Sequence, residues 1–192
     1  VEPAEDAVSV RTRQGQSLSA RLVVGADGRN SLAREAAGIE VSRRDLQQSA
    51  ITFNISHGRP HRNISTEFHT PHGPCVFVPL TGNRSSVVWV TTPKEAERLK
   101  GLSDAELSEA AEKQSHSILG RVEVEPGRHL FPLGIERPKR FAKDRIVLVG
   151  ESAHVLPPIG AQGLNMGMRD AADIADIAGL SISSGEDPGA AP

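Results

Sequence analysis

Two apolar runs, each ending at a glycine, constrain this chain more than any other feature. The first run ends at Gly25 and the second at Gly150. Continuous apolar runs predict strands that are covered on both faces, because neither face then favours polar side chains. A short helix is expected after the first strand, over residues 31–37, and a further helix after the second, from about 164 to 178. The sequence therefore predicts two strand–turn–helix units that are far apart along the chain.

The residues before and between these units indicate further strands. Residues 8–10 and 17–25 alternate as strands around a turn at Gly15. Turn-forming sequences then separate β-rich segments in a way that is typical of an antiparallel sheet, at residues 49–56, 65–69, 75–80 and 86–92. A strand is also expected over residues 121–131.

Helical segments are predicted after the last of these segments. Pro93 opens a short helix, and Ser103 with Glu106 forms a capping box at the start of the next. The spacing of apolar residues places one set on a single face of the second helix: Leu107, Ala110, Ala111 and Ile118. The aromatic and apolar residues of the neighbouring strands can belong to a pocket or to the core, with core the simpler interpretation: Phe53, Phe68, Phe77, Val78 and Trp89.

Composition excludes several classes of function. Hydrophobic residues make up 38% of the 192 residues and charged residues 24%, which is the balance of a globular protein with a core. The formal net charge is -2 and there is no basic block, so no nucleic-acid partner is expected. The single cysteine, Cys75, is interpreted as a small buried hydrophobe. The seven histidines show no metal-ligand spacing, and no metal is predicted.

The ends of the chain carry weaker signals. The chain opens at Val1 without a signal peptide, which suggests an excised piece of a longer chain or a processed chain. Residues 183–192 are typical of a linker. No apolar run is long enough to cross a bilayer, and a cytoplasmic location is expected.

The turn after the first apolar run contains Asp27 and Gly28. Glycine at a strand exit lets the backbone approach a ligand closely, and a carboxylate there can accept hydrogen bonds from sugar hydroxyls. Many such turns contain glycine and aspartate for turn geometry alone, so both interpretations stay open.

The turn after the second apolar run is more specific. Glu151 follows the predicted strand, and a diproline turn at Pro157 and Pro158 leads to Gly160 and Gly163. The helix that begins near Leu164 would direct its free amides and positive dipole end into this loop. Such a helix start favours an anion or an electron-rich carbonyl. A loop shaped only for packing would not explain this combination of residues.

Together these segments resemble the paired motifs of the FAD-dependent aromatic hydroxylase family, which includes para-hydroxybenzoate hydroxylase and the ubiquinone-biosynthesis hydroxylases. Residues 22–34 match its Asp-Gly motif, and residues 149–171 match its Gly-Asp motif. The resemblance implies a mixed α+β fold. Residues 1–45 and 141–192 would form part of a Rossmann-like FAD-binding domain. Residues 46–140 would form an inserted substrate domain, an antiparallel sheet with helices on one face.

The resemblance also implies the residues that contact FAD: Asp27, Gly28, Arg34, Gly150, Glu151, Pro158, Gly160, Gly163, Leu164 and Asn165. Glu151 stands where the family usually has aspartate, so its contact with the ribityl chain must shift. No catalytic side chain is assigned, because the flavin carries the chemistry. For His154 a role as scaffold and a role at the substrate side both stay open, and Pro158 would line the face where substrate meets flavin.

The implied activity is hydroxylation of an aromatic ring with NAD(P)H and O2, on a phenolic substrate such as a polyprenylated ubiquinone precursor. The Gly-x-Gly-x-x-Gly unit that holds the ADP half of FAD does not occur in the chain, so we expect weak FAD binding and no activity of the chain alone. Alternatives are a reductase or halogenase on the same scaffold, or a non-enzymatic binding module. An NAD-dependent dehydrogenase would need a nucleotide-binding fingerprint, which this sequence does not contain. Oligomeric state and peripheral membrane association of the longer protein stay open.

Overall fold

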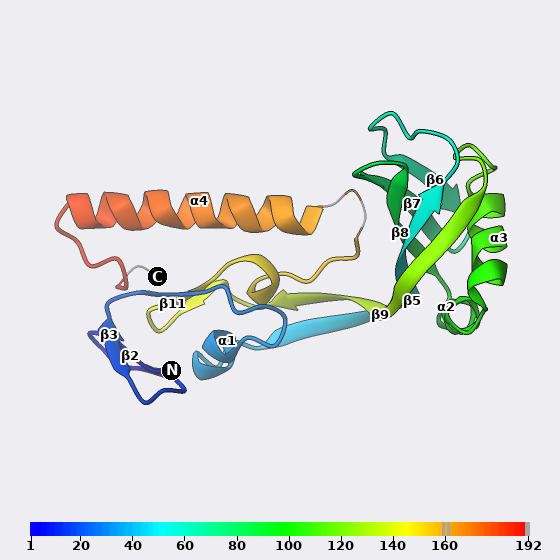
Figure 1. Cartoon of the computed structure of the whole chain (residues 1–192). Helices are drawn as coiled ribbons and strands as arrows, with labels where there is room; N and C mark the ends of the chain where they lie inside the picture. Colours follow the sequence, from blue (N-terminus) through cyan, green and yellow to red (C-terminus); the bar gives the residue numbers. More distant parts are fainter. Residues whose placement is uncertain (159, 161, 191–192) are drawn as a thin grey trace. The chain divides into compact units, whose positions relative to one another are not determined.

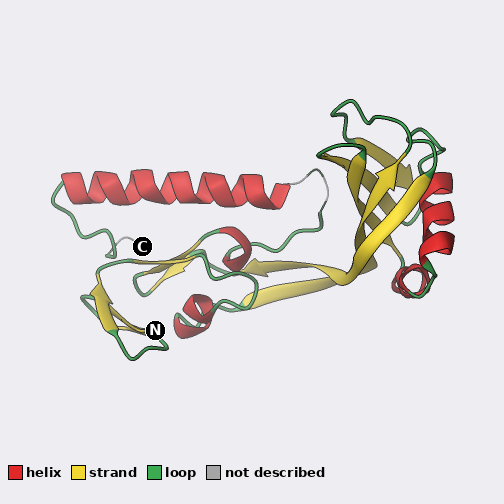
Figure 2. Cartoon of the chain, viewed as in Figure 1, coloured by secondary structure: helices red, strands yellow, loops and turns green. Residues whose placement is uncertain are grey.

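The computed structural model describes residues 1–158, 160 and 162–190. The chain divides into two compact units. Unit 1 comprises Val1–Arg44 and Gly134–Pro192, and unit 2 comprises Asp45–Leu133. The fold is a mixture of α and β, as predicted, with antiparallel sheets and few helices (Figure 2). The predicted assignment of residues 1–45 and 141–192 to FAD and of residues 46–140 to substrate stays a prediction.

Unit 1 contains small sheets and the long helix α4 (Figure 1). One sheet is antiparallel, in the order β1 (Glu2–Pro3), β2 (Val8–Arg11) and β3 (Ser17–Ala20). A second sheet has the order β10 (Ala142–Lys143), β11 (Ile146–Leu148) and β4 (Val23–Gly25), with β11 parallel to β4. The helical segments are α1 (Leu32–Ala36), the 3-10 turn η1 (Gly150–Ser152) and α4 (Gln162–Ser183).

The predicted strand over residues 17–25 is wrong as a single element. It divides at Arg21 and Leu22, because β3 pairs with β2 whereas β4 pairs with β11. The short helix expected over residues 31–37 is confirmed as α1, and the Ser31 hydroxyl caps it by accepting from the Arg34 amide. Helix α4 extends beyond its predicted end and includes the first residue of the expected linker, Ser183.

The core of unit 1 lies between α1 and the β4–β11 pair, and its buried members are Val8, Ala33, Ala37, Ile39, Ile146, Leu148 and Ala153. Gly25 allows α1 to pack closely on β4. A Cβ atom at Gly25 would lie 2.8 Å from the Cβ of Ala33, closer than real Cβ contacts allow. The glycine at this strand exit therefore serves helix packing as well as the turn.

Unit 2 is built on an antiparallel sheet, as predicted, in the order β6-β7-β8-β5-β9. The strands are β5 (Val41–His57), β6 (Thr66–Thr70), β7 (Gly73–Leu80), β8 (Arg84–Thr91) and β9 (Val122–Pro138). Helices α2 (Pro93–Lys100) and α3 (Asp104–Gln114) cover one face of this sheet (Figure 1). β5 and β9 are longer than predicted, and each runs across a boundary between the units.

Strand alternation decides which side chains reach the core of unit 2. Phe53 and Phe77 both pair with Val87 across the sheet, and all of these side chains lie under the helices with Leu107. The predicted inner face of α3 is confirmed at Leu107 and Ala111, while Ala110 packs at its edge. Ile118 is wrongly placed by that pattern. The helix ends at Gln114, and Ile118 is exposed.

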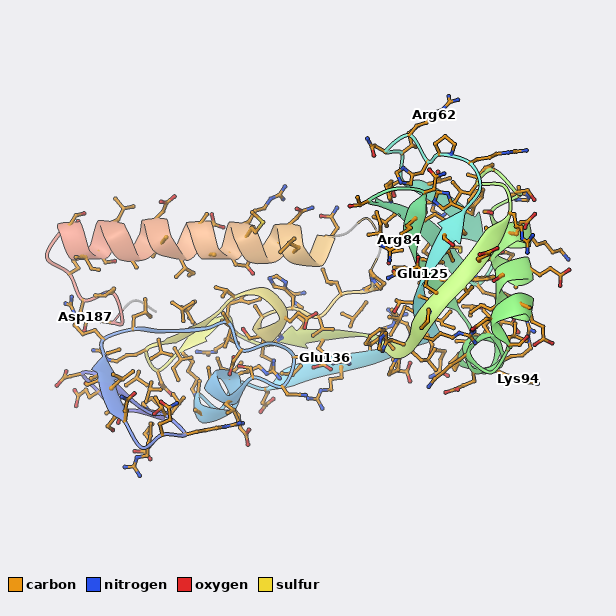
Figure 3. The ribbon with its side chains drawn as sticks, viewed as in Figure 1. Arg62, Arg84, Lys94, Glu125, Glu136 and Asp187 are labelled. Carbon is orange, nitrogen blue, oxygen red and sulfur yellow. The ribbon has the colours of Figure 1, made fainter. Side chains whose placement is uncertain are left out.

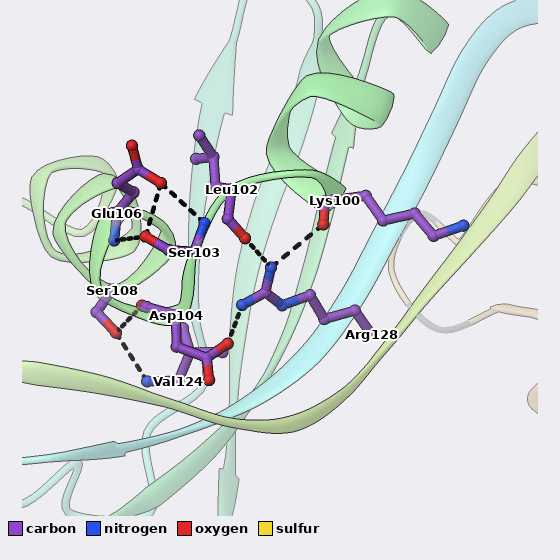
Figure 4. A network of polar contacts seen from close by, with 8 residues as sticks. All are labelled: Lys100, Leu102, Ser103, Asp104, Glu106, Ser108, Val124 and Arg128. Carbon is purple, nitrogen blue, oxygen red and sulfur yellow. Dashed lines mark hydrogen bonds and ion pairs between the residues drawn. The ribbon is translucent and has the colours of Figure 1, made fainter.

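Arg128 on β9 joins the sheet to the corner between α2 and α3 (Figure 4). Its guanidinium donates to the carbonyl oxygens of Lys100 and Leu102 and pairs with the Asp104 carboxylate. Only 14% of the Arg128 side chain is exposed. The guanidinium thus satisfies carbonyls at the end of α2 that have no partner inside the helix.

Replacing Arg128 with methionine is expected to lower the free energy of unfolding of unit 2 by about 2 kcal/mol, because the charged hydrogen bonds of a largely buried guanidinium are lost. The chain has one tryptophan, Trp89, and it lies in unit 2, so urea unfolding followed by its fluorescence reports this unit. Arg121→Met is the matched control, since the Arg121 side chain is 85% exposed. Equal midpoints for both variants would refute the proposed role of the network.

Candidate functional site

The ends of β4 and β11 lie side by side in unit 1. Leu148 is in register with Gly25, and the Val149 amide donates to the Gly25 carbonyl at 3.0 Å. Because the strands are parallel, their carboxyl ends meet at the same edge of the sheet, where ligands of open α/β sheets bind. The two motifs singled out in the sequence therefore begin at one edge.

Asp27 stabilises the turn between β4 and α1. Its Oδ1 accepts from the Ser31 hydroxyl at 2.5 Å, and its Oδ2 accepts from the Ala33 amide at 3.0 Å. Burial acts to raise the pKa of Asp27, but these hydrogen bonds outweigh it, and the pKa lies below its usual value. Asp27 is therefore ionised and stabilises the start of α1, and each oxygen keeps room for a further donor.

Arg34 joins the two motifs. Its Nη1 donates to the Ser152 carbonyl at 2.9 Å and its Nη2 donates to the Arg29 carbonyl at 2.7 Å. The residue is buried, and the Ser152 hydroxyl donates in turn to the Gly25 carbonyl. Arg34 thus contacts the backbone of both turns. Ser152 was not singled out in the sequence, because a small polar residue after a strand carries no signal of its own.

Glu151 differs from Asp27 in its surroundings. It is exposed, and among the described residues no hydrogen bond or ion pair engages its carboxylate. A Cβ atom built at Gly28 or at Gly163 would meet nothing within 4 Å, so a ligand can approach the backbone there. These features suit the ribityl and flavin portion of FAD, which brings hydroxyl donors for a carboxylate and carbonyls for backbone amides.

The remaining predicted contacts belong to the turn after β11 and the first turn of α4. Gly150 and Gly160 both have a φ of 62°, a conformation that glycine adopts without strain. Pro158, Leu164 and Asn165 are exposed. Their contacts with FAD stay predictions.

His154 pairs with Asp170 on α4. The Nε2 atom lies 2.8 Å from Asp170 Oδ2, and 11% of the His154 side chain is exposed. The same carboxylate oxygen accepts from the Gly150 amide at 2.8 Å. His154 therefore contributes to the scaffold of the turn, whereas a contact with substrate stays a prediction.

Glu136 is a buried acid that sequence reasoning missed. Glu136 belongs to β9 and is labelled in Figure 3. Its Oε1 accepts from Arg29 Nε at 2.7 Å, and Arg43 Nε lies 3.5 Å from its Oε2. Its backbone also forms a bridge with Val155 in the turn after β11. No sequence signal could have joined these residues, because they come from three separate segments.

The pocket candidates in unit 2 separate into core and surface. Phe53 and Phe77 are buried in the core, and Phe68 and Trp89 pack against it. Val78 is 40% exposed and lies on the face of the sheet opposite to the helices. Cys75 is buried as expected, and burial raises the pKa of its thiol far above the ordinary value.

The described part of the chain contains no cluster of three or more His, Cys, Asp or Glu side chains placed to hold a metal ion. Within the same residues, no helix is long and apolar enough to span a membrane.

Comparison with known proteins shows similarity along most of the chain. Residues 2–183 match a family described as FAD binding domain. The chain is 37% identical over 185 residues to ubiquinone hydroxylase UbiL of Rhodospirillum rubrum, covering 96% of this chain and 43% of that protein. It is 31% identical over 182 residues to 3-demethoxyubiquinol 3-hydroxylase of Escherichia coli, covering 95% and 46%. The chain thus spans less than half the length of these relatives.

Solved structures show the same fold. Aklavinone-11 hydroxylase in a ternary complex with FAD and aklavinone aligns with a TM-score of 0.72 and 21% identity, over 92% of this chain and 34% of that one. The myxobacterial chondrochloren halogenase CndH, an FAD-dependent halogenase, aligns with a TM-score of 0.72 and 19% identity, over 97% and 46%. At these identities the likeness concerns the fold alone.

Proposed function

The chain belongs to the FAD-binding domain family, and on that premise we propose that it forms the flavin-side part of an FAD-dependent monooxygenase that hydroxylates an aromatic ring. FAD is the cofactor that this membership implies. The proposal treats the chain as part of a longer enzyme.

One observation carries the proposal furthest. The exposed, unpaired carboxylate of Glu151 follows β11, at the edge of the sheet where β4 also ends. An exposed acid needs no explanation by itself, but the backbone is also open at Gly28 in the turn after β4 and at Gly163 in the first turn of α4. Glu151 would accept a hydrogen bond from a ribityl hydroxyl, and the open backbone would let the cofactor lie close.

Bound FAD would supply the redox chemistry, taking two electrons from NAD(P)H and using them to activate O2. Overall, O2, NAD(P)H, one proton and the ring C–H would give the ring C–OH, NAD(P)+ and one water molecule. The residues of the chain would bind and orient the cofactor. Asp27 and Arg34 stabilise the turns after β4 and β11, and Glu151 would accept a hydrogen bond from the ribityl chain. The amides at the start of α4 would favour negative charge on the flavin.

The substrate that we propose is a phenol of ubiquinone biosynthesis, because curated relatives are named ubiquinone hydroxylases. The open face of the unit 2 sheet, which includes Val78, would supply a wall of the substrate cavity. Use of NAD(P)H and a cytoplasmic location are predictions, and peripheral membrane association stays open.

We predict that the chain by itself binds FAD weakly and, above all, no more tightly than FMN or riboflavin. The contacts described here suit the ribityl-flavin portion, and without a Gly-x-Gly-x-x-Gly unit the ADP half would contribute little. Fluorescence titration with each flavin measures the affinities. Glu151→Ala is expected to weaken binding about tenfold, the equivalent of one charged hydrogen bond. Glu109→Ala on the exposed side of α3 is the matched control.

Tight binding of FAD with a perturbed flavin spectrum would contradict the prediction for the chain alone. The activity itself is tested with the full-length protein, NAD(P)H, a polyprenylated phenol and ¹⁸O2. Incorporation of one labelled oxygen into the ring supports the proposal. Oxidation of NAD(P)H without any hydroxylated product would instead favour a reductase on the same scaffold.

A further inference from the structure

One carboxylate oxygen joins helix α4 to the turn after β11. Asp170 Oδ2 accepts from the Gly150 amide at 2.8 Å and lies 2.8 Å from His154 Nε2. We call this arrangement the Asp170 clasp. Because a carboxylate only accepts, the proton of the neutral imidazole resides on Nε2. Nδ1 is then a buried acceptor without a hydrogen-bond partner among the described residues, so Asp170 orients the ring by hydrogen bonding, and Phe141 packs against it edge-to-face with ring centroids 6.4 Å apart.

The backbone at the clasp is shaped for close approach. A Cβ atom at Gly167 would lie 3.3 Å from the Gly150 Cα, tighter than most real contacts. Gly150 has a φ of 62°, which a residue with a side chain would adopt only under strain. These glycines let α4 approach the turn that carries Glu151, so that Asp170 reaches the Gly150 amide.

The side chains of α4 are poorly buried. None of its described side chains is buried, and Leu164, Met168 and Leu180 are exposed. A cavity of about 720 Å³ lies between its later turns and the β10–β11 strands, with Ile174, Phe141 and Ile146 in its lining. Apolar packing therefore contributes little to the position of this helix, and the clasp joins it to the turn after β11.

We propose that Asp170 and His154 are positioning residues that set the start of α4 relative to Glu151 and so shape the seat of the flavin. The inference rests on the function proposed above. Asp170 acts on the flavin seat through α4 and through the turn after β11, and His154 acts through its contact with Asp170. Asp173 and Asp176 are exposed on the same helix and have no such role.

The clasp is tested first on the chain itself by hydrogen exchange. Asp170→Ala should speed exchange about tenfold in peptides that cover residues 148–156 and 162–170, because the acceptor of the Gly150 amide is lost. Asp173→Ala is the matched control. Both substitutions raise helix propensity equally, so faster exchange in only one cannot arise from propensity. Asp170→Asn keeps an oxygen acceptor and should restore part of the protection.

The imidazole provides an independent signature. In ¹⁵N NMR spectra at a pH where His154 is neutral, the native chain should show the tautomer protonated on Nε2. Asp170→Ala should give a mixture of tautomers, and Asp173→Ala should leave the spectrum unchanged. Equal exchange and equal tautomers in the two variants would overturn the clasp, whether or not the protein binds FAD.

The positioning role is tested on the full-length protein. There Asp170→Ala should shift the absorption bands of bound flavin and weaken FAD binding at least several-fold, whereas Asp173→Ala should change neither. Faster exchange without any change in the flavin would restrict Asp170 to a structural role and overturn the inference, while leaving the proposed function intact. Failure of the unmutated full-length protein to bind FAD would refute the proposed function and the positioning role with it.

Discussion

Replacing Arg34 with methionine is expected to destabilise unit 1 by about 3 kcal/mol, because it leaves the buried carbonyl of Ser152 and the partly buried carbonyl of Arg29 without their donor. Methionine is similar in length and apolar, so lost packing contributes little. Arg34→Lys keeps the charge, but one ammonium cannot reproduce both directions of the guanidinium, and we expect about half of the loss.

Denaturant unfolding monitored by hydrogen exchange in α1 and β11 measures the effect of Arg34 in its own unit. Arg13→Met is the control, since Arg13 is exposed on the loop between β2 and β3. If Arg34→Met unfolds at the same denaturant concentration as this control, the guanidinium does not join the two motifs in solution.

The second large effect is expected at Phe77, where alanine should lower the free energy of unfolding of unit 2 by about 3–5 kcal/mol. Phe77 is 2% exposed and packs against Phe68 with ring centroids 5.9 Å apart. Its neighbour Val78 points to the other face of β7 and is 40% exposed. Val78→Ala should therefore change stability by less than about 1 kcal/mol.

Urea unfolding followed by Trp89 fluorescence compares the two substitutions directly. They are adjacent in the chain and on the same strand, so strand propensity and local exposure of the backbone are matched. A loss at Val78 as large as that at Phe77 would mean that both faces of the sheet are covered in solution. The open face would then be unsuited to a substrate.

The distinction between Phe77 and Val78 shows where sequence reasoning ends. Both residues lie in one apolar segment, and the sequence left pocket and core open for each. Alternation along a strand says only that neighbours point to opposite faces. The helices that follow decide which face is covered, and that depends on how the chain returns after β8.

Signals within a few residues were predicted well. The capping box at Ser103 and Glu106 is present, because its hydrogen bonds form within one helical turn. The strand after Arg145 and the helix after Ser31 were found from apolar runs and glycines. The length of β5 was underestimated because its outer part, residues 41–48, is mostly polar, and that of β9 because Pro132, Gly134 and Pro138 are residues that usually interrupt a strand.

The amino-acid sequence by itself determined the mixed fold, the antiparallel sheet under its helices and the membership of an FAD-binding family, since caps, apolar periodicity and motifs are local. Only the tertiary structure decided how the polar groups are used. Arg34 and Ser152 are separated by 118 residues, and Arg29 and Glu136 by 107. The hydrogen bond from Arg34 to the Ser152 carbonyl exists only once β4 and β11 pair in parallel, and the Arg29–Glu136 contact exists only once β9 reaches the turn after β4. The tertiary structure thus uses Arg34 for the scaffold and leaves Glu151 open to a ligand.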